Sequence, residues 1–330
     1  MKILITGVAG FIGSNLADHL LREYRHHRRG TQNSPLKIIG IDNLSYGARE
    51  QIPKDVEFYK MDIRSKDIYP LFVGVDYVFH LAAKNCLSDC QDDPVQTADI
   101  NVTGTVNVFE AAKMAKVKKV IYAETSALYE GSRKFPTPES EIKPESVYAN
   151  SKVASMYFAE AYKKFFKMKF TALRYFNVYG PRQDYRRTIP PIMSAFIIRL
   201  LAHQPPIIYG TGEKKRDFVY VDDVNDFHIL CIKNSSTDGK VFNVGSGQCY
   251  SILDIYNFVC DFLGVKIPPV YKENLVWEAE DTLANITQAK KLGWKPKTDI
   301  REGLTRMISY IQDEIRKGNI RLNKYKMSEV

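Results

Sequence analysis

The chain has 330 residues, of which 45% are apolar and 26% charged, and its net charge is +9 at pH 7. This length fits a two-lobed globular protein, and the composition excludes disordered and fibrous classes. Its apolar runs are shorter than the roughly 20 residues that span a bilayer, and the apolar start is too short for a signal peptide, so we expect a cytoplasmic protein without a membrane partner.

Basic clusters and cysteines suggest no further partner. The clusters carry no recognition motif for nucleic acid, so we expect none to bind and interpret them as solvated helix faces or as support for an anionic small substrate. The five cysteines are scattered and odd in number, which favours free thiols over disulfides. No metal site is predicted, because Cys86 and Cys90 have no second pair or nearby histidine.

The first half of the chain alternates short apolar runs with helical patterns. We expect strands over residues 2–6, 37–41, 76–81, 119–123 and 170–174, and helices over 14–24, 102–116 and 146–166. Such alternation predicts βαβ units, and therefore an α/β fold with a doubly wound parallel sheet. Beyond about residue 177, prolines interrupt the pattern and indicate a smaller mixed α/β lobe. The segment 217–244, with strand-like runs over 218–221 and 240–244, is expected to return to the main sheet.

Three glycines follow the first strand and open a helix. Gly7, Gly10 and Gly13 stand where a Rossmann-type dinucleotide site needs a tight turn, a close approach to a pyrophosphate and close helix packing. Their spacing is G-x-x-G-x-x-G rather than G-x-G-x-x-G, and an ordinary glycine-rich turn is the alternative.

Asp42 ends the second strand, where a carboxylate would bind the ribose hydroxyls and favour NAD over NADP. It lies 35 residues after Gly7 (42 − 7), against about 20 in the usual pattern, and a polar insertion over 24–35 accounts for the excess. Asp62, after the third strand, suits the adenine edge.

A tyrosine and a lysine share one helix face after a strand that ends near a hydroxyl. Tyr148 and Lys152 are four residues apart, and Thr125 follows the strand over 119–123. An ammonium beside a phenol lowers the pKa of the phenol, which can then remove a proton from a sugar hydroxyl while NAD takes the hydride.

Together these motifs resemble the extended short-chain dehydrogenase/reductase family of NAD-dependent nucleotide-sugar epimerases and dehydratases. The resemblance runs from residue 1 to about 296. Besides the motifs above, it is carried by His80-Leu-Ala-Ala83, Asn101-Val-Thr-Gly-Thr105, Arg174-Tyr-Phe-Asn-Val-Tyr-Gly-Pro181, Arg216-Asp-Phe-Val-Tyr-Val-Asp-Asp223 and Leu292-Gly-Trp294.

The resemblance implies roles for two sets of residues, beside the catalytic Tyr148, Lys152 and Thr125. NAD would be bound by Gly7, Gly10, Phe11, Ile12, Gly13, Asp42, Asn43, Asp62, Ile63, Leu81, Ala82, Ala83, Asn101, Tyr148, Lys152 and Tyr175. The nucleotide sugar would be bound by Lys84, Thr125, Ser126, Tyr148, Asn177, Tyr209, Arg216, Glu278 and Thr282. Residues 1–176 would be the NAD-binding domain and 177–330 mainly the nucleotide-sugar lobe. The helices over 102–116 and 146–166 would pair across a two-fold axis in a homodimer.

The residues after Thr125 separate the reactions of the family. Dehydratases and decarboxylases carry acidic residues there, whereas this chain has Ser126 and Ala127. The pattern therefore predicts a 4-epimerase of a UDP-hexose or UDP-N-acetylhexosamine. A UDP-uronic acid 4-epimerase, an atypical dehydratase or decarboxylase, and a non-catalytic NAD-sensing regulator are the alternatives, and uridine against thymidine stays open.

Four positions depart from the family or bear on the sugar. Glu124 stands just before the hydroxyl position, where the family often has serines, and is interpreted as an outward-facing charge at a strand end. An expected arginine is missing near Glu278, which stands in for an aspartate. Lys84 begins a substrate loop that differs from many relatives. Thr282, three residues before Asn285, is a small residue expected near the C2 substituent of the sugar.

Overall fold

Runs of buried apolar residues form a parallel sheet of seven strands in the computed structural model, which describes residues 1–26, 36–187, 189–274 and 279–322. All six strand pairs are parallel. Strands covered on both faces are apolar throughout rather than alternating, and β6 accordingly is buried at every position. The spatial order is β3 (Val56–Lys60), β2 (Lys37–Asp42), β1 (Lys2–Thr6), β4 (Tyr77–His80), β5 (Lys119–Thr125), β6 (Phe170–Tyr175) and β10 (Lys240–Val244).

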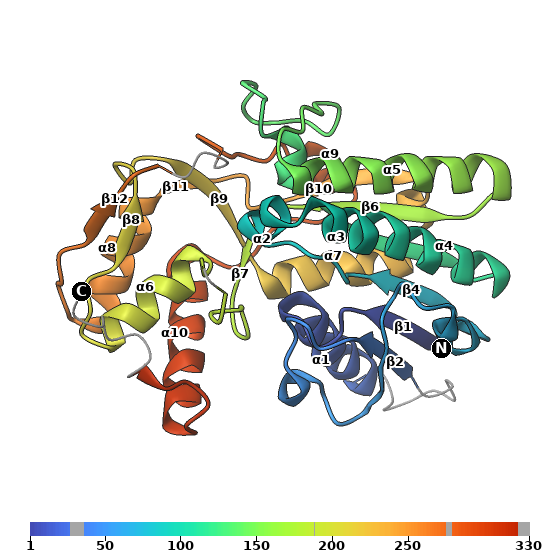
Figure 1. The fold of residues 1–330 in the computed structure, drawn as a ribbon, viewed down its shortest axis with the longest axis horizontal. Coiled ribbons are helices and arrows are strands. Elements are labelled where there is room, and N and C mark those ends of the chain that lie inside the picture. Colours follow the sequence, from blue (N-terminus) through green and yellow to red (C-terminus); the bar gives the residue numbers. More distant parts are fainter. Residues whose placement is uncertain (27–35, 188, 275–278, 323–330) are drawn as a thin grey trace.

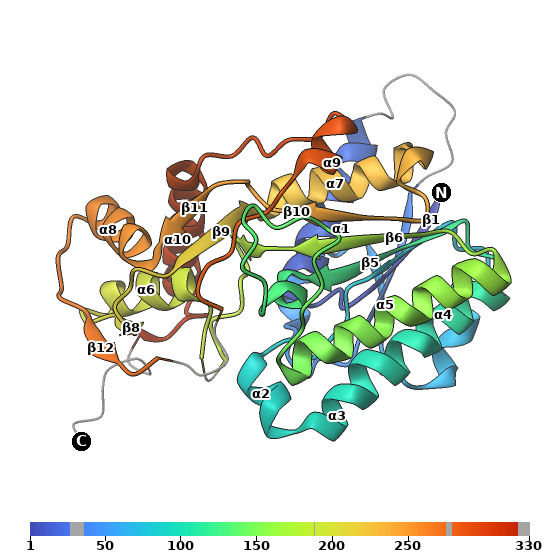
Figure 2. The ribbon, with the colours of Figure 1, turned by 90° about the horizontal axis from the view of Figure 1, so that it is seen from above.

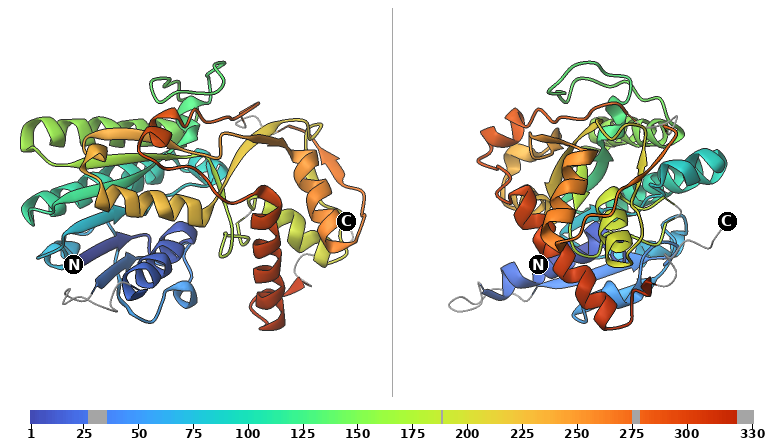
Figure 3. Two further views of the ribbon diagram at one scale, coloured as in Figure 1. Left: turned by 180° about the vertical axis from the view of Figure 1, so that it is seen from behind. Right: turned by 90° about the vertical axis from the view of Figure 1, so that its left-hand side faces the viewer.

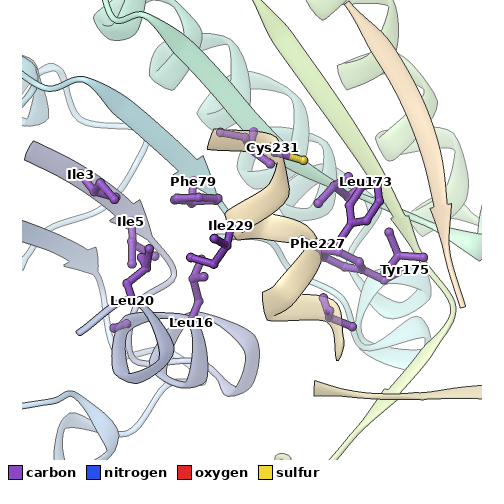
Figure 4. Packing of buried hydrophobic residues seen from close by; sticks show 14 of the residues in the cluster. Ile3, Ile5, Leu16, Leu20, Phe79, Leu173, Tyr175, Phe227, Ile229 and Cys231 are labelled. Carbon is purple, nitrogen blue, oxygen red and sulfur yellow. The ribbon is translucent and has the colours of Figure 1, made fainter. Parts of the chain in front are cut away.

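Helices cover both faces of this sheet (Figure 1, Figure 2). On one face lie α1 (Phe11–His26) and α7 (Val221–Lys233), and on the other α4 (Gly104–Met114) and α5 (Val147–Phe166), preceded by the short α2 (Leu87–Asp92) and α3 (Pro94–Ala98). Figure 4 shows Leu16 of α1 and Ile229 of α7 packed together over the sheet. The predicted α/β fold with a doubly wound parallel sheet is confirmed. None of the helices in the described part of the chain is long and apolar enough to cross a membrane.

A smaller mixed lobe lies beyond the carboxyl end of the sheet, and Figure 3 shows the same two-lobed outline from behind. Its core is separate from that of the large sheet. It contains a sheet of β7 (Asn177–Tyr179), β9 (Lys215–Tyr220) and β11 (Cys249–Ser251), a pair of β8 (Ile207–Tyr209) and β12 (Val270–Lys272), and the helices α6 (Ile192–Leu201), α8 (Ile252–Leu263) and α10 (Ile300–Arg316). The short α9 (Thr287–Lys291) instead contacts β10 of the large sheet.

The structure corrects two expectations. The strand expected over 218–221 does not join the large sheet, because β10 occupies the edge of β6 and β9 pairs with β7 instead. The helix expected over 102–116 begins as a π-helical turn, Asp99–Thr103, and is α-helical over Gly104–Met114. The expected insertion over 24–35 begins inside α1, and residues 27–35 lie outside the described part of the chain.

A cluster of charges joins α1 to α7 and reaches α10. His19 Nε2 lies 3.3 Å from Asp226 Oδ1, and its Nδ1 lies 3.8 Å from Asp222 Oδ1. Arg306 of α10 lies 3.9 Å from the other oxygen of Asp222. Burial alone would lower the pKa of His19, but the two carboxylates outweigh it and raise this pKa to about 9. His19 is therefore a cation held between two anions at neutral pH.

We expect the stability of the protein to fall as the pH rises through about 9, in part because of His19. A histidine whose pKa is higher in the folded than in the unfolded state stabilises the folded protein. This stabilisation is complete at pH values below the unfolded-state pKa of 6.5, and it is lost at pH values above the folded-state pKa. The contribution is on the order of 3 kcal/mol, from the difference between a pKa of 6.5 and one of about 9. Denaturant unfolding should be measured at several pH values. Between pH 6.5 and 9, the free energy of unfolding should decline less for His19→Gln than for the parent. Parallel curves for the two proteins would contradict the role of His19.

Candidate active site

The glycine turn after β1 brings the backbone close to the next strand of the sheet. Gly7 has a φ of +75°, and a Cβ there would lie 2.7 Å from the backbone nitrogen of Ala82. A Cβ on Gly13 would collide with the carbonyl oxygen of Gly7. Only glycine fits both positions, and the turn leads directly into α1, whose first N–H groups have no partners within the helix. This cradle suits the pyrophosphate of a dinucleotide.

A cavity of about 210 Å³ opens above this turn at the carboxyl end of the sheet. Its walls include every residue predicted to bind NAD except Asn101, and also Lys84. A role of Asn101 in NAD binding therefore stays a prediction. Its buried amide lies behind the wall, where it accepts from the Lys84 N–H (2.8 Å) and donates to the carbonyl of Lys84 (2.9 Å) and to Ser151 Oγ (2.9 Å). Asn101 thus braces the loop after β4 against α5.

Two acidic side chains, Asp42 and Asp62, line this cavity. Asp42 is 9% exposed and accepts the backbone N–H groups of Ala9 (3.0 Å) and Leu44 (2.8 Å), one at each oxygen. Burial raises the pKa of Asp42, and these two bonds oppose the rise. Asp62 accepts from Asn43 (3.0 Å) and from Arg64, which holds the pKa of that carboxyl well below its usual range. Each oxygen of Asp42 keeps a lone pair for a ribose hydroxyl.

Asp42→Ala should weaken NAD binding and reduce the preference for NAD over NADP. The substitution removes the acceptors for the ribose hydroxyls and the charge that repels a 2′-phosphate. Both cofactors should be titrated against protein stripped of bound nucleotide, and the ratio of the two dissociation constants compared with that of the parent. The more exposed Glu57 of β3 offers a control, since Glu57→Ala should leave the ratio unchanged. An unaltered ratio in Asp42→Ala would remove Asp42 from the ribose site.

Tyr148 and Lys152 lie on the first turns of α5, which Ser146 caps by accepting the Ala149 N–H at 3.1 Å. Burial raises the pKa of Tyr148 to about 12, and a hydrogen bond with the Thr125 hydroxyl opposes the rise. Burial lowers the pKa of Lys152 to about 8. Tyr148 borders both this cavity and the next, whereas Lys152 lines the first and Thr125 the second, so the three predicted catalytic side chains lie where the two cavities meet.

Two charges near Tyr148 act on its phenol in opposite directions. The Arg187 cation lowers the pKa of the phenol, whereas the Glu130 anion raises it. The charge that acts on Lys152 is Glu124. An effect of the Lys152 ammonium on the phenol stays a prediction.

A second cavity, of about 400 Å³, continues from Tyr148 into the smaller lobe. The predicted residues Thr125, Ser126, Asn177, Arg216 and Thr282 all line it. Thr282 Oγ1 accepts from the Asp217 N–H (3.1 Å) and from Asn177 Nδ2 (3.2 Å), which fixes its place in the wall.

Two predicted substrate residues lie outside this cavity. Lys84 borders the first cavity, and Tyr209 lines a separate open hollow with Tyr271 and Lys272. Tyr209 lies there because β8 pairs with β12 in a sheet separate from the large one. No local sequence pattern indicates this position. Glu278 lies outside the described residues.

Sequence reasoning missed the loop between β7 and α6, which borders both cavities. Its Asp184 and Arg187 face each other at 3.1 Å, and Gln183 lines the second cavity. The run Arg182-Gln-Asp-Tyr-Arg-Arg187 directly after the Gly180-Pro181 motif is a usable signal, because such a charged run beside a binding motif is unusual for a structural loop.

Known proteins share this arrangement along nearly the whole chain. Residues 3–245 match the model of a family described as the NAD dependent epimerase/dehydratase family. The structure resembles that of UDP-glucose 4-epimerase from Thermotoga maritima with UDP-glucose, with a TM-score of 0.89 and 33% identity over 96% of this chain and all (100%) of that one.

Two further similar proteins differ in the sugar that their names give. One is the UDP-N-acetylglucosamine 4-epimerase from Methanobrevibacter ruminantium in complex with UDP-N-acetylmuramic acid, with a TM-score of 0.88 and 30% identity over 95% of this chain and 98% of that one. The other is the UDP-glucuronate 4-epimerase of Thermodesulfobacterium geofontis, which is 31% identical over 333 residues, 94% of this chain and 96% of that protein.

Proposed function

The chain belongs to the NAD dependent epimerase/dehydratase family, and from this premise we propose that it is a 4-epimerase of a UDP-hexose or UDP-N-acetylhexosamine. It is an enzyme with NAD as its cofactor. Its similarity to UDP-sugar 4-epimerases along almost its full length supports the reaction and the uridine nucleotide. In the same proposal, residues 1–176 with α7 and β10 bind NAD, and most of the remaining chain binds the nucleotide sugar.

The observation that carries this choice is the wall beside Thr125. Ser126 and Ala127 follow it and line the sugar cavity, and neither can act as the acid or base that elimination of water requires. Glu130, which also lines the cavity, accepts from the N–H and the hydroxyl of Ser146 at 2.8 and 2.9 Å. These contacts favour epimerisation over dehydration or decarboxylation.

Bound in the first cavity, NAD would supply a reversible hydride acceptor for C4 of the sugar. The Thr125 hydroxyl holds the C4 oxygen, and Tyr148, deprotonated to the phenolate, accepts the hydroxyl proton at its phenol oxygen and gives it back after the sugar has turned. Thr125 is itself held, because its Oγ1 accepts from the Ala127 N–H at 3.1 Å. The cavity of about 400 Å³ falls in the range of small-molecule sites and leaves room for the sugar to turn.

A UDP-uronic acid is the second candidate substrate, and one observation favours it. Arg187 borders the sugar cavity close enough to Tyr148 to lower the pKa of the phenol. A guanidinium there could pair with a sugar carboxylate after releasing Asp184. The similar UDP-glucuronate 4-epimerase agrees with this reading.

Product analysis over a panel of nucleotide sugars tests both candidates. The purified protein should convert a UDP-hexose or UDP-N-acetylhexosamine to its C4 epimer without a change in mass, as resolved by ion-exchange chromatography and mass spectrometry. Conversion of UDP-glucuronate alone would favour the second candidate, and the thymidine-linked sugar tests the nucleotide. Loss of water or of carbon dioxide from the product would refute epimerisation.

We also propose that the enzyme is a cytoplasmic homodimer. Large apolar side chains are exposed along α5 and at the end of α4, with Tyr157 66%, Phe165 69% and Met114 63% exposed. The two helices lie side by side on one face of the molecule (Figure 2). Such an apolar surface supports a two-fold interface, and the five free cysteines suit a reducing compartment. Light scattering should give twice the mass of one chain; the mass of a single chain would contradict the proposal.

A further inference from the structure

Glu124 is buried beside the catalytic residues, which corrects its interpretation as an outward-facing charge. Its side chain is 0% exposed, and it stands one residue before Thr125 at the end of β5. The correction has a physical reason, because Arg174 lies directly opposite in the parallel pair of β5 and β6. A charge can be buried at a strand end when an opposite charge meets it there.

The carboxylate of Glu124 is satisfied on both oxygens. Arg174 Nε donates to Oε2 at 2.6 Å, and the Tyr122 hydroxyl donates to Oε1 at 2.7 Å. Arg174 is held in turn by the Tyr129 hydroxyl (2.9 Å) and the carbonyl oxygen of Glu139 (2.5 Å). These contacts fix the carboxylate and the guanidinium against each other at the end of β5.

This ion pair faces the helix that carries the catalytic lysine. Arg174 Nη2 lies 3.4 Å from the sulfur of Met156 on α5. Met156 follows Lys152 by four residues and therefore shares its helix face. Glu124 and Lys152 also border the same cofactor cavity.

From this geometry we infer that Glu124 is a positioning residue for catalysis, whose fixed negative charge keeps Lys152 protonated and in place beneath the cofactor cavity. The inference rests on the proposed function, in which Lys152 works as an ammonium. Burial lowers the pKa of Lys152 to about 8, and Glu124 opposes this effect. Without Glu124, a larger share of the enzyme would hold a neutral lysine at neutral pH.

The other titratable groups around Lys152 do not replace Glu124. His80 of β4 is buried and neutral, because burial lowers its pKa to about 3, and it bonds to Thr6 and Thr105. Tyr148 precedes Lys152 on α5, and burial raises the pKa of Tyr148 to about 12. Tyr175 of β6 borders the same cavity, but its hydroxyl lies 2.6 Å from His228, and burial keeps its pKa well above the usual value. Among these groups, Glu124 is the one whose charge raises the pKa of Lys152.

The test is the pH dependence of turnover in Glu124→Gln, measured on the NAD-loaded protein. The amide keeps the size and part of the hydrogen bonding but removes the charge. The alkaline limb of kcat, where Lys152 loses its proton, should move down by about one pH unit, the effect of removing one nearby opposite charge. NMR of ¹³C-lysine-labelled protein should show the same downward shift for Lys152, identified by its loss in Lys152→Met.

Two further variants separate this role from a structural one. Glu124→Gln leaves Arg174 buried without its counter-charge, which can impair folding, so the double variant Glu124→Gln/Arg174→Met removes both charges. The double variant should keep the shifted limb and the shifted lysine signal. A return to the parental pH profile would show that Glu124 only neutralises Arg174 and would overturn the inference.

A matched control is Glu110→Gln on α4, which removes a carboxylate bonded to Tyr162 of α5 at 2.9 Å, away from the cavities. Its pH profile should equal that of the parent, and an equal shift there would also overturn the inference. If the parent turns over no nucleotide sugar, the proposed function fails, whereas the NMR titration of Lys152 still decides the role of Glu124.

Discussion

Tyr148→Phe should give a folded protein that retains NAD and turns over its nucleotide sugar at least about 100-fold more slowly, the contribution typical of a positioned acid–base group. The substitution removes only the phenol oxygen, which has a hydrogen bond with Thr125 and borders both cavities. The ring remains to pack at the start of α5. Initial rates under saturating substrate, together with NAD released on denaturation, measure the two effects separately.

Tyr157→Phe is the matched control for Tyr148→Phe. Tyr157 lies on the same helix, but its side chain is 66% exposed, away from both cavities. Removal of the Tyr157 hydroxyl should leave the turnover rate within about twofold of the parental rate, as for most surface changes. Turnover near the parental rate in Tyr148→Phe would remove the phenol from the mechanism.

Thr282→Tyr should act selectively on sugars with an N-acetyl group. We expect the parent to turn over both UDP-glucose and UDP-N-acetylglucosamine, because the small Thr282 leaves space in the wall of the sugar cavity. A tyrosine would fill that space, and the clash should lower kcat/KM for the acetylated sugar about 10- to 100-fold more than for UDP-glucose. This range corresponds to the roughly 1–3 kcal/mol that overpacking costs.

Thr282→Val separates the size of the side chain from its hydrogen bonds. Valine keeps the volume but loses the contacts with Asp217 and Asn177. It should lower the two activities by similar factors and leave their ratio unchanged. Equal losses of both activities in Thr282→Tyr, or a parent that ignores acetylated sugars, would contradict the argument from size.

The parts of the site that local sequence patterns determine could be predicted. Gly7 and Gly13 stand at positions that exclude a Cβ, and Tyr148 and Lys152 share a helix face through their spacing alone. The alternation of strands and helices likewise predicted the parallel sheet, because a crossover between parallel strands is usually made by a helix.

The features that depend on distant partners could not be predicted. Glu124 can be buried because Arg174, 50 residues later in the sequence, pairs with it from the neighbouring strand. Asn101 turns from the cofactor cavity because Ser151 and the Lys84 backbone take its amide. β9 pairs with β7 while β10 takes the edge of β6, and the hydrophobic pattern of β9 does not show which of these strands it will join.

The late position of β10 in the sequence affects how the protein folds during its synthesis. β10 pairs with β6 only after the chain has passed through the smaller lobe, and α7, which covers α1, follows β9 without a loop. The larger lobe is therefore discontinuous in sequence. A ribosome must synthesise past residue 244 before that lobe can close its sheet, so we expect nascent chains that end near 176 to leave the edge of β6 and one side of α1 open to chaperones. For the same reason, a protease cut between the lobes should not release an independently stable fragment.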